Sequence, residues 1–237
     1  MEFFGLANYQ YLDNRLVIDD VTLQNILSQY QQFNISNSFS ERVRNIEFGV
    51  EIPPPPAKPS TPPLKILYAG RGTPQKRIWL LNRIVEHFIN KEAAVEFIFA
   101  GSMSDELSDT VKEKCIVYGE IGDKNTLNRL YNDSHAIILT SAFEGFPVVI
   151  KEGMSFGCIP IVTALPGNKT HLQNLQNALL IESPEDELMV VQHAIQNIEL
   201  LLSHPVLMNE ISANAYKYAK ENFTRDEFLK KYKELLA

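Results

Sequence analysis

Short apolar runs alternate with helix-length amphipathic segments between residues 65 and 204. The apolar runs predict strands and the segments between them predict helices. Strands that are apolar at successive positions are typical of parallel sheets buried on both faces. We therefore expect an α/β fold: a Rossmann-like, doubly wound, mainly parallel six-stranded sheet with a C-terminal helical tail from residue 205 onwards. The expected strands are Lys65–Ala69, Val95–Ala100, Ile116–Tyr118, Ala136–Leu139, Ile159–Val162 and Ala178–Ile181, and the expected helices are Ile78–Asn90, Thr126–Tyr131, Pro147–Phe156 and Glu185–Leu202.

The residues before this pattern divide into two parts. Seven of the thirteen prolines fall between Pro53 and Pro63, and such a segment takes an extended path with a solvated backbone. We expect a linker over residues 51–64 that joins residues 1–50 to a larger domain at residues 65–237. The first part contains one candidate strand and one candidate helix and is too short for an independent core, so it is expected to pack on something else. These two elements are Arg15–Ile18 and Val21–Tyr30.

Composition narrows the possible classes of function. The net charge of −7, without a concentrated basic patch, argues against nucleic acid as a partner. The sequence has neither the pattern of a secretory signal nor an apolar stretch of membrane-spanning length. Cys115 and Cys158 are typical of small buried residues in a reducing compartment. We expect a cytoplasmic location, which leaves room for peripheral association with the inner face of the membrane.

Two glutamates stand in the apolar strand–turn–helix–strand unit at residues 141–163. Glu144 follows the strand expected at Ala136–Leu139, and Glu152 lies within the next expected helix. In open parallel sheets, ligands bind outside the carboxyl ends of the strands, where a helix N-terminus attracts phosphate. The unit therefore predicts a crevice that both carboxylates border, with a nucleotide-like ligand.

A loop with two glycines and two cations follows the first strand of the larger domain. Gly70 and Gly72 allow the backbone to approach a diphosphate closely, and Arg71 and Lys76 stand beside them. A P-loop and the dinucleotide-binding fingerprint would both require glycine at Gln75, so both matches are weak. The third interpretation is that Arg71 and Lys76 neutralise a diphosphate with their side chains, in place of a bound metal.

These motifs together resemble the C-terminal, donor-binding lobe of the retaining glycosyltransferases of family 4 (glycosyl transferases group 1), which have the two-lobed GT-B fold. The resemblance spans roughly residue 46 to the end of the chain, and the order and spacing of its motifs in one βα frame make it specific. The motifs are Gly70-Arg71 with Lys76 five residues later, Leu130-Tyr131, Glu144-Gly-Phe-Pro with Glu152 eight residues on, and Phe156-Gly-Cys-Ile-Pro160.

The resemblance implies a role for each motif residue. Arg71 and Lys76 would bind the diphosphate of a nucleotide sugar, Glu144 would orient the donor sugar, and these three are the expected catalytic residues. Glu152 would accept hydrogen bonds from the ribose hydroxyls. The other expected donor-binding positions are Gly70 and Gly72 in the loop after the first strand, Val117 and Tyr118 near the base, and Gly145, Phe146, Pro147 and Val148 near the phosphates or sugar.

The implied reaction is the transfer of a hexose-type sugar from a nucleoside diphosphate sugar to a glycan or lipid-linked acceptor, with retention of anomeric configuration. This chain would supply the donor-binding half, and residues 1–50 would be a remnant of the N-terminal lobe, with at most one strand and one helix. No cofactor and no metal are expected, because the sequence has no Asp-x-Asp triplet and its five histidines lack metal-ligand spacing. The sequence departs from the family pattern at Pro147, where glycine is frequent, at Gly153, where alanine is usual, and at Leu165–Lys169, which replaces a glycine-rich loop.

Two other functions remain open at this stage. The chain could be a non-catalytic nucleotide-sugar-binding module or a subunit that needs a partner lobe, which apolar faces on the Val21–Tyr30 and Phe228–Leu236 helices would contact. A glycosidase with Glu144 as nucleophile and Glu152 as acid is disfavoured. A retaining hydrolase needs its two carboxyl groups about 5–5.5 Å apart across one bond, and a strand edge and a helix interior need not converge in that way.

Overall fold

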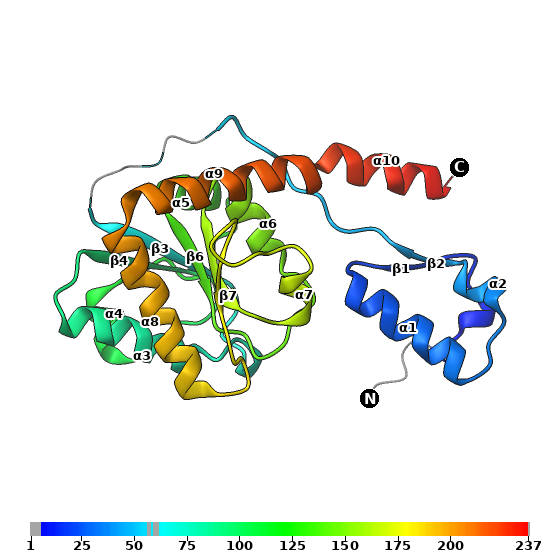
Figure 1. Cartoon of the computed structure of the whole chain (residues 1–237), viewed down its shortest axis with the longest axis horizontal. Coiled ribbons are helices and arrows are strands. Elements are labelled where there is room, and N and C mark those ends of the chain that lie inside the picture. Colours follow the sequence, from blue (N-terminus) through cyan, green and yellow to red (C-terminus); the bar gives the residue numbers. More distant parts are fainter. Residues whose placement is uncertain (1–5, 56–57, 59–61, 237) are drawn as a thin grey trace.

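The computed structural model describes residues 6–55, 58 and 62–236 of the chain. Its main sheet has six strands in the order β5-β4-β3-β6-β7-β8 (Figure 1). All of their pairings are parallel, which confirms the expected α/β class and makes the sheet wholly rather than mainly parallel. The strands are β3 (Leu64–Ala69), β4 (Val95–Ala100), β5 (Ile116–Val117), β6 (Ala136–Leu139), β7 (Ile159–Thr163) and β8 (Leu179–Ile181).

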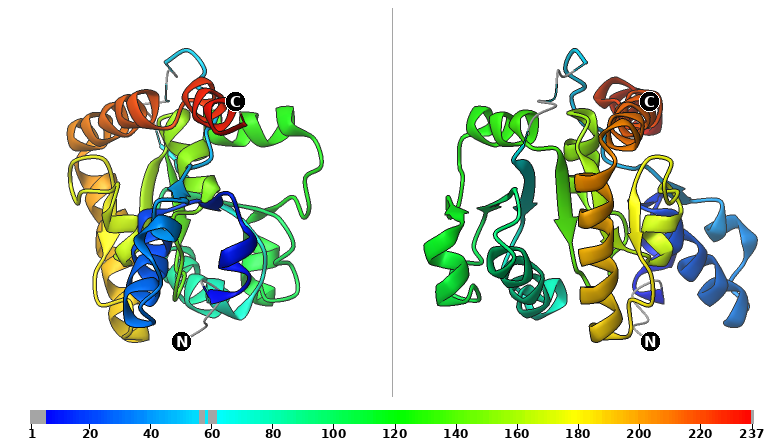
Figure 2. Two further views of the ribbon diagram at one scale, coloured as in Figure 1. Left: turned by 90° about the vertical axis from the view of Figure 1, so that its right-hand side faces the viewer. Right: turned by 60° about the vertical axis from the view of Figure 1, so that its left-hand side comes forward.

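Helices cover both faces of this sheet (Figure 2). The chain moves outward from β3 to the edge strand β5 and then returns to β6, so right-handed crossovers put α3 and α4 on one face and α5 and α6 on the other. α8 packs against α3, and α9 packs against α6. The helices are α3 (Ile78–Asn90), α4 (Asp109–Lys114), α5 (Lys124–Asp133), α6 (Val148–Ser155), α7 (Pro166–Lys169), α8 (Glu187–Ser203), α9 (Pro205–Asn222) and α10 (Arg225–Leu236), with a 3₁₀ turn at Pro74–Lys76.

The core explains why these segments form these elements. Every residue of β6 and of β7 is buried, as expected for strands with helices on both faces. In α3 the buried side chains recur at three- and four-residue intervals, for example at Ile78, Leu81, Val85 and Phe88, so one face of the helix packs on the sheet. The expected helix α6 begins one residue later than predicted, with Pro147 as its N-cap.

The switch in strand order falls between β3 and β6. Ile66 and Leu67 of β3 pair with Ala136 and Ile137 of β6, so the carboxyl ends of the two strands are neighbours. The chain leaves these ends toward opposite edges of the sheet, which opens a crevice between the two following loops. Both loops that the sequence analysis selected, residues 70–77 and residues 140–147, therefore border the same crevice.

A smaller unit precedes the main sheet and lies beside it in Figure 1. The expected strand and helix are confirmed as β1 (Arg15–Val17) and α1 (Asp20–Gln32). The limit of one strand and one helix is wrong, because β2 (Val43–Asn45) pairs in parallel with β1 and α2 (Asn37–Ser40) connects α1 to it. Only one residue of the sequence Val-Arg-Asn in β2 is apolar, and so this strand gives no apolar run.

The smaller unit has a core of its own, formed by Val17, Ile26, Tyr30 and Val43. The apolar face of α1 therefore packs on β1 and β2, which corrects the expectation that this face is open for a partner. On α10, by contrast, Leu229 is 36% and Tyr232 is 40% exposed.

The proline-rich linker lies partly outside the described residues, at positions 56–57 and 59–61, so its expected extended path stays a prediction there. Lys58 is described, and its ammonium donates to the carbonyl oxygens of Tyr131 at 2.7 Å, Asn132 at 3.0 Å and Ser134 at 2.6 Å. Burial lowers the pKa of Lys58. The lysine thus fastens the linker to the C-terminal end of α5. In the part of the chain that is described, no helix has the length and apolarity to cross a membrane.

Candidate functional site

Hydrogen bonds join the loop after β3 to the loop after β6. The amide of Ala142 donates to the carbonyl of Gln75 at 2.8 Å, and the side-chain amide of Gln75 donates to the carbonyl of Phe143 at 2.6 Å. The hydroxyl of Thr140 donates to the carbonyl of Lys76 at 2.9 Å. These contacts hold the two sides of the crevice in one fixed arrangement, which is a precondition for a preorganised binding site.

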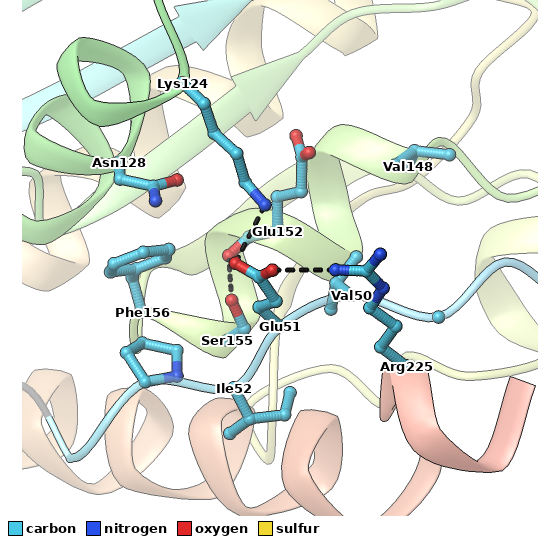
Figure 3. A pocket seen from close by; sticks show the side chains of 12 residues that line it. Val50, Glu51, Ile52, Lys124, Asn128, Val148, Glu152, Ser155, Phe156 and Arg225 are labelled. Carbon is cyan, nitrogen blue, oxygen red and sulfur yellow. Dashed lines mark hydrogen bonds and ion pairs between the residues drawn. The ribbon is translucent and has the colours of Figure 1, made fainter. Parts of the chain in front are cut away.

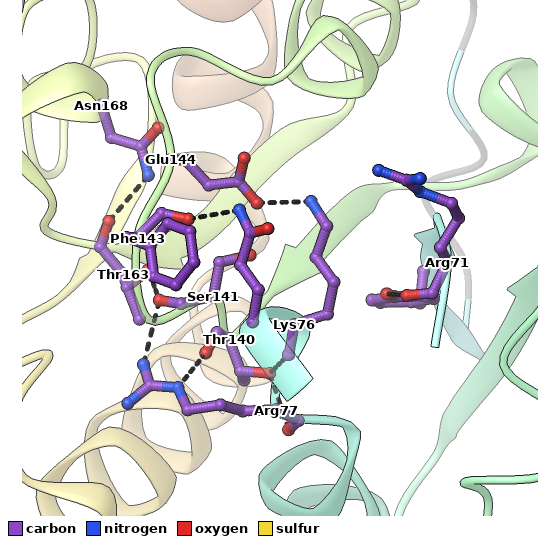
Figure 4. Close-up of polar contacts among 11 residues, drawn as sticks. Arg71, Lys76, Arg77, Thr140, Ser141, Phe143, Glu144, Thr163 and Asn168 are labelled. Atoms are coloured by element: carbon purple, nitrogen blue, oxygen red, sulfur yellow. Dashed lines mark hydrogen bonds and ion pairs between the residues drawn. The ribbon is translucent and has the colours of Figure 1, made fainter. Parts of the chain in front are cut away.

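Arg77 is the buried anchor of this arrangement, a role that the sequence analysis did not assign. Its guanidinium donates to the carbonyl oxygens of Thr140 at 2.6 Å and Ser141 at 3.0 Å (Figure 4), and to that of Pro184 at 2.7 Å. Burial lowers the pKa of Arg77, opposed by the charge of Glu187. The backbone of Arg77 is left-handed, with φ of 51°, which ends the 3₁₀ turn and starts α3. A cation beside a glycine-containing loop can thus have a structural role, and its burial distinguishes it from a cation that binds a ligand.

Lys76 and Glu144 are brought into direct contact across the crevice (Figure 4). Lys76 comes from the 3₁₀ turn after β3, and Glu144 from the loop after β6. Their side chains are only 14% and 13% exposed, so this ion pair is screened far less than a surface pair. The sequence analysis selected both residues from separate motifs, and the fold places them together.

Arg71 lies at the rim of a cavity of about 310 Å³ at the carboxyl ends of β3 and β4. Its side chain is exposed, and its backbone carbonyl accepts a hydrogen bond from the hydroxyl of Tyr68 at 2.8 Å. In the view of Figure 4, Arg71 is drawn to the right of Lys76 and Glu144 to the left. The cavity is lined by Ala69, Gly70, Arg71, Ala100, Gly101, Ser102, Glu120, Ile121, Leu127, Tyr131 and Val149.

Tyr131 connects this cavity to Glu152. The hydroxyl of Tyr131, on α5, donates to the carboxylate of Glu152, on α6, at 2.9 Å. Burial raises the pKa of Glu152, and the hydrogen bond from Tyr131 and the charge of Lys124 lower it in part. Burial also raises the pKa of Tyr131, so that its proton stays on the phenol and the hydroxyl remains a donor. The carboxylate of Glu152 is therefore held by a neutral donor whose own ring lines this cavity.

A second cavity of about 490 Å³ lies on the other side of Glu152 (Figure 3). Within it, Glu51 of the connecting segment accepts from Lys124 at 2.8 Å and from Arg225 at 3.0 Å. The hydrogen bond from Lys124 lowers the pKa of Glu51 most, although all three side chains are more than half exposed. The cavity is lined by Gly49, Val50, Glu51, Ile52, Pro53, Lys124, Asn128, Val148, Glu152, Ser155, Phe156 and Arg225.

The turn between Glu144 and α6 is packed too closely for larger residues. A Cβ atom at Gly167 would lie 1.8 Å from the carbonyl oxygen of Gly145, so the chain after β7 requires glycine there. A Cβ atom at Gly145 would lie 2.6 Å from a carboxylate oxygen of Asp19, the N-cap of α1. Thus the smaller unit contacts the site turn directly through Asp19, which is itself buried.

The other expected donor-binding positions are distributed around this turn. Phe146 is buried, Pro147 caps α6, and Val148 borders the larger cavity. Gly72 lies against Glu106, because a Cβ atom there would come 2.2 Å from its carboxylate. Val117 and Tyr118 are not among the residues that line the cavity next to Arg71, where Glu120 and Ile121 stand instead, and Tyr118 is 49% exposed. Their assignment to the base stays a prediction.

The arrangement is suited to an anionic ligand that also carries hydroxyl groups. Lys76 contacts Glu144 across the crevice, Arg71 stands at the rim of the cavity beside it, and the carboxylates of Glu144 and Glu152 can accept hydrogen bonds from hydroxyls. Among the described residues, no group of three His, Cys, Asp or Glu side chains is positioned to hold a metal ion. The chemistry that these side chains themselves offer is charge stabilisation and orientation of a polar ligand.

Three solved structures illustrate the fold that this chain shares. The chain matches TarM with a TM-score of 0.76 and 21% identity over 96% of this chain and 44% of that one, and a variant of Staphylococcus aureus TarM was crystallised with fondaparinux, alpha-GlcNAc-glycerol and UDP. The pneumococcal O-GlcNAc transferase GtfA, in complex with UDP and GlcNAc, matches with a TM-score of 0.76 and 22% identity over 98% of this chain and 46% of that one. Anabaena HepE with UDP and glucose gives a TM-score of 0.76 at 16% identity, over 96% of this chain and 64% of that one.

Sequence relatives agree with this fold. The poly(ribitol-phosphate) alpha-N-acetylglucosaminyltransferase of Staphylococcus aureus is 25% identical over 89% of this chain and 43% of that protein. An uncharacterised glycosyltransferase of Methanocaldococcus jannaschii is 26% identical over 70% of this chain and 42% of that protein. The chain therefore spans less than half the length of these curated relatives. The family model for glycosyl transferases group 1 matches residues 51–218, and the chain belongs to this family, with the α/β architecture of a GT-B lobe.

Proposed function

We propose that this chain forms the donor-binding half of a retaining glycosyltransferase of family 4, which transfers a hexose-type sugar from a nucleoside diphosphate sugar to a glycan or lipid-linked acceptor. The observation that carries the proposal is the direct contact between Lys76 and Glu144 across the crevice between the loops that follow β3 and β6. Family membership supports the transferase class. Residues 1–50 are the part of the chain that we assign to the N-terminal lobe, and residues 51–64 are the linker.

In this proposal the diphosphate lies between the two cations and the turn after β6. The bond between the anomeric carbon of the sugar and the diphosphate oxygen breaks, a bond from that carbon to an acceptor oxygen forms, and the proton of the acceptor hydroxyl passes to the leaving diphosphate. Negative charge grows on the leaving diphosphate as the sugar gains oxocarbenium character. Lys76 and Arg71 stabilise that charge, which is the contribution that a preorganised cationic site makes to the rate.

The two glutamates have separate tasks in this proposal. Glu152 accepts hydrogen bonds from the ribose hydroxyls, and Tyr131 supports it by fixing one of its oxygens at 2.9 Å. Glu144 accepts from the donor sugar and at the same time holds the ammonium of Lys76 toward the crevice. We also propose turnover without a metal or other cofactor, because the side chains of Arg71 and Lys76 supply positive charge for the diphosphate.

The alternative function is a nucleotide-sugar-binding module, or a subunit that acts with a partner lobe. It is favoured by one observation, the partly exposed apolar side chains Leu229 and Tyr232 on α10, which a partner lobe would cover. The acceptor would then be bound by that partner. In either case we propose action in the cytoplasm, with peripheral contact to the membrane where the acceptor is lipid-linked.

Titration distinguishes these functions. The chain is titrated calorimetrically with UDP-glucose, UDP-GlcNAc and the guanine and adenine counterparts, and hydrolysis and transfer are then assayed separately. Binding together with transfer to a glycan acceptor supports the enzyme, and binding without transfer supports the module. Failure to bind any of these donors, by a chain that is folded by circular dichroism, contradicts both.

A further inference from the structure

A buried charged cluster lies directly behind the site turn and has no part in the function proposed above. The ammonium of Lys151, on α6, donates to the carboxylate of Glu47 at 2.8 Å, and the second oxygen of Glu47 lies 3.2 Å from Nε2 of His171. The side chains are 2% exposed for Lys151, 22% for Glu47 and 11% for His171. We call these three residues the buried cluster.

The cluster touches the site turn through Phe146, the third residue of the Glu144-Gly-Phe-Pro motif. The ammonium of Lys151 lies 5.5 Å from the centre of the Phe146 ring and 4.8 Å from that of Phe223. The rings of His171 and Phe146 are 4.4 Å apart between their centres. The position of Phe146, and with it the path of the backbone from Glu144 to Pro147, therefore depends on the charged groups around this ring.

The members of the cluster come from segments that are far apart in the sequence. Glu47 belongs to the segment that leaves β2 and leads to the main sheet, and the carbonyl of its neighbour Phe48 also accepts from Lys151 at 3.2 Å. Further along the same segment, the backbone amide of Val50 donates to the carbonyl of Phe223 at 2.7 Å. The carbonyl of Val50 accepts from the amide of Arg225 at 3.0 Å, and both contacts lie at the junction of α9 and α10. The connecting segment is thus fastened to the back of the site at two successive points.

Stability alone does not account for a lysine at this position. A charge that is removed from water is costly, and replacing a buried ion pair by apolar side chains of similar volume is often neutral or stabilising. The other buried residues of α6, Ile150, Gly153, Met154 and Ser155, are small or apolar, and an apolar residue at position 151 would fit among them. The ion pair instead fixes the position of α6 relative to the connecting segment, because it joins one atom of the helix to one carboxylate of that segment.

We infer that Lys151 and Glu47 are positioning residues for the Glu144–Pro147 turn, and that docking of the segment 47–50 thereby controls recognition of the diphosphate of the donor. The inference rests on the proposed function. It assigns the cluster mainly to the phosphate end of the ligand, because Phe146 belongs to the turn, whereas the carboxylate of Glu152 is held separately by the hydroxyl of Tyr131 on α5. The consequence is that the cluster affects binding of the second phosphate more than binding of the base and ribose.

The test compares two ligands that differ in one phosphate. Dissociation constants of UDP and UMP are measured for the whole chain and for Lys151→Met and Glu47→Gln, with Lys91→Met as the matched control, since Lys91 pairs with Glu199 at an exposed position. We expect the affinity for UDP to fall by about tenfold or more in the first two variants, as for the loss of a coupled neighbour, and the affinity for UMP to change by less than about twofold. The control should keep both constants.

A role in folding alone would lower both affinities together, so an unchanged ratio of UDP to UMP affinity in folded variants overturns the inference. If Lys151→Met is unfolded by circular dichroism, Glu47→Gln decides the question, because the amide keeps the shape of the carboxylate and removes only its charge. A wild-type chain that binds neither these nucleotides nor their guanine and adenine counterparts contradicts the proposed function itself. Binding by the wild type with an unaltered ratio in Glu47→Gln contradicts only the role of the cluster.

Discussion

The lowered pKa of Glu47, whose carboxylate is partly buried, predicts how the stability of the fold changes in acid. Burial alone would raise the pKa of Glu47, but hydrogen bonds from His171 and Lys151 outweigh it and lower the pKa from 4.5 to about 2. A depressed folded-state pKa stabilises the fold at pH values above 4.5, and this stabilisation is lost as the pH falls toward 2. The shift of about 2.5 units corresponds to about 3 kcal/mol in total, of which about 2 kcal/mol is lost between pH 7 and pH 3.

The perturbation is Glu47→Gln, which removes the titrating group and nearly preserves its shape. Urea unfolding is followed by circular dichroism at pH 7, 4.5 and 3 for the wild type and the variant. We expect the wild type to lose about 2 kcal/mol more of its free energy of unfolding than the variant between pH 7 and pH 3. Glu199→Gln is the control, because Glu199 pairs with Lys91 at the surface, where ion pairs contribute little.

The reasoning is refuted if the free energies of the wild type and of Glu47→Gln fall in parallel between pH 7 and pH 3. That result would mean that Glu47 has a similar pKa in the folded and unfolded chains, and hence that its contacts with Lys151 and His171 do not persist in solution. A difference of the expected size in Glu199→Gln as well would show that the effect is not specific to the buried cluster.

Three further substitutions test separate parts of the site. In the complete enzyme, Lys76→Ala should lower the transfer rate by about 10²–10³, as for loss of one group that stabilises a developing anion, and near-normal turnover contradicts its role. Gly167→Ala puts a Cβ atom 1.8 Å from the carbonyl of Gly145 and should destabilise the fold by about 1–3 kcal/mol in urea unfolding, whereas Gly122→Ala, where a Cβ meets nothing within 4 Å, should not. Tyr131→Phe removes the hydroxyl that supports Glu152, so calorimetry should find a smaller preference for UDP over its 2′-deoxy analogue, and an unchanged preference argues against a ribose contact.

Much of the fold follows from the sequence because its strands are buried on both faces. Successive apolar residues, as in Ala136–Leu139, identify such a strand and show that both of its faces are buried. All six strands of the main sheet were predicted to within a few residues. The elements that were missed are polar: β2 has one apolar residue, and α4, with the sequence Asp-Thr-Val-Lys-Glu-Lys, has a single buried one. Such short elements form because tertiary contacts complete them, and their own pattern is too weak to predict them.

The residues of the site likewise divide into those that the sequence predicts and those that it does not. Lys76 and Glu144 could be selected in advance, because a strand end in a parallel sheet fixes where the following loop lies, and neighbouring strands bring two such loops together. Arg77, Glu47 and Lys151 could not be assigned, since each is a charged residue whose burial depends on partners 60 or more residues away. In α6, Lys151 interrupts an apolar run, and this is the one local sign that a partner for its charge exists.

The central claim is that a pyrophosphate lies between the Arg71 and Lys76 side chains and the turn after β6, with its ribose on Glu152. A crystal structure of this chain with UDP tests it most directly. The account predicts phosphate oxygens within about 3.2 Å of the nitrogens of Lys76 and Arg71, and a ribose hydroxyl within the same distance of the Glu152 carboxylate. Well-ordered UDP bound elsewhere, with its phosphates away from both cations, would contradict the account.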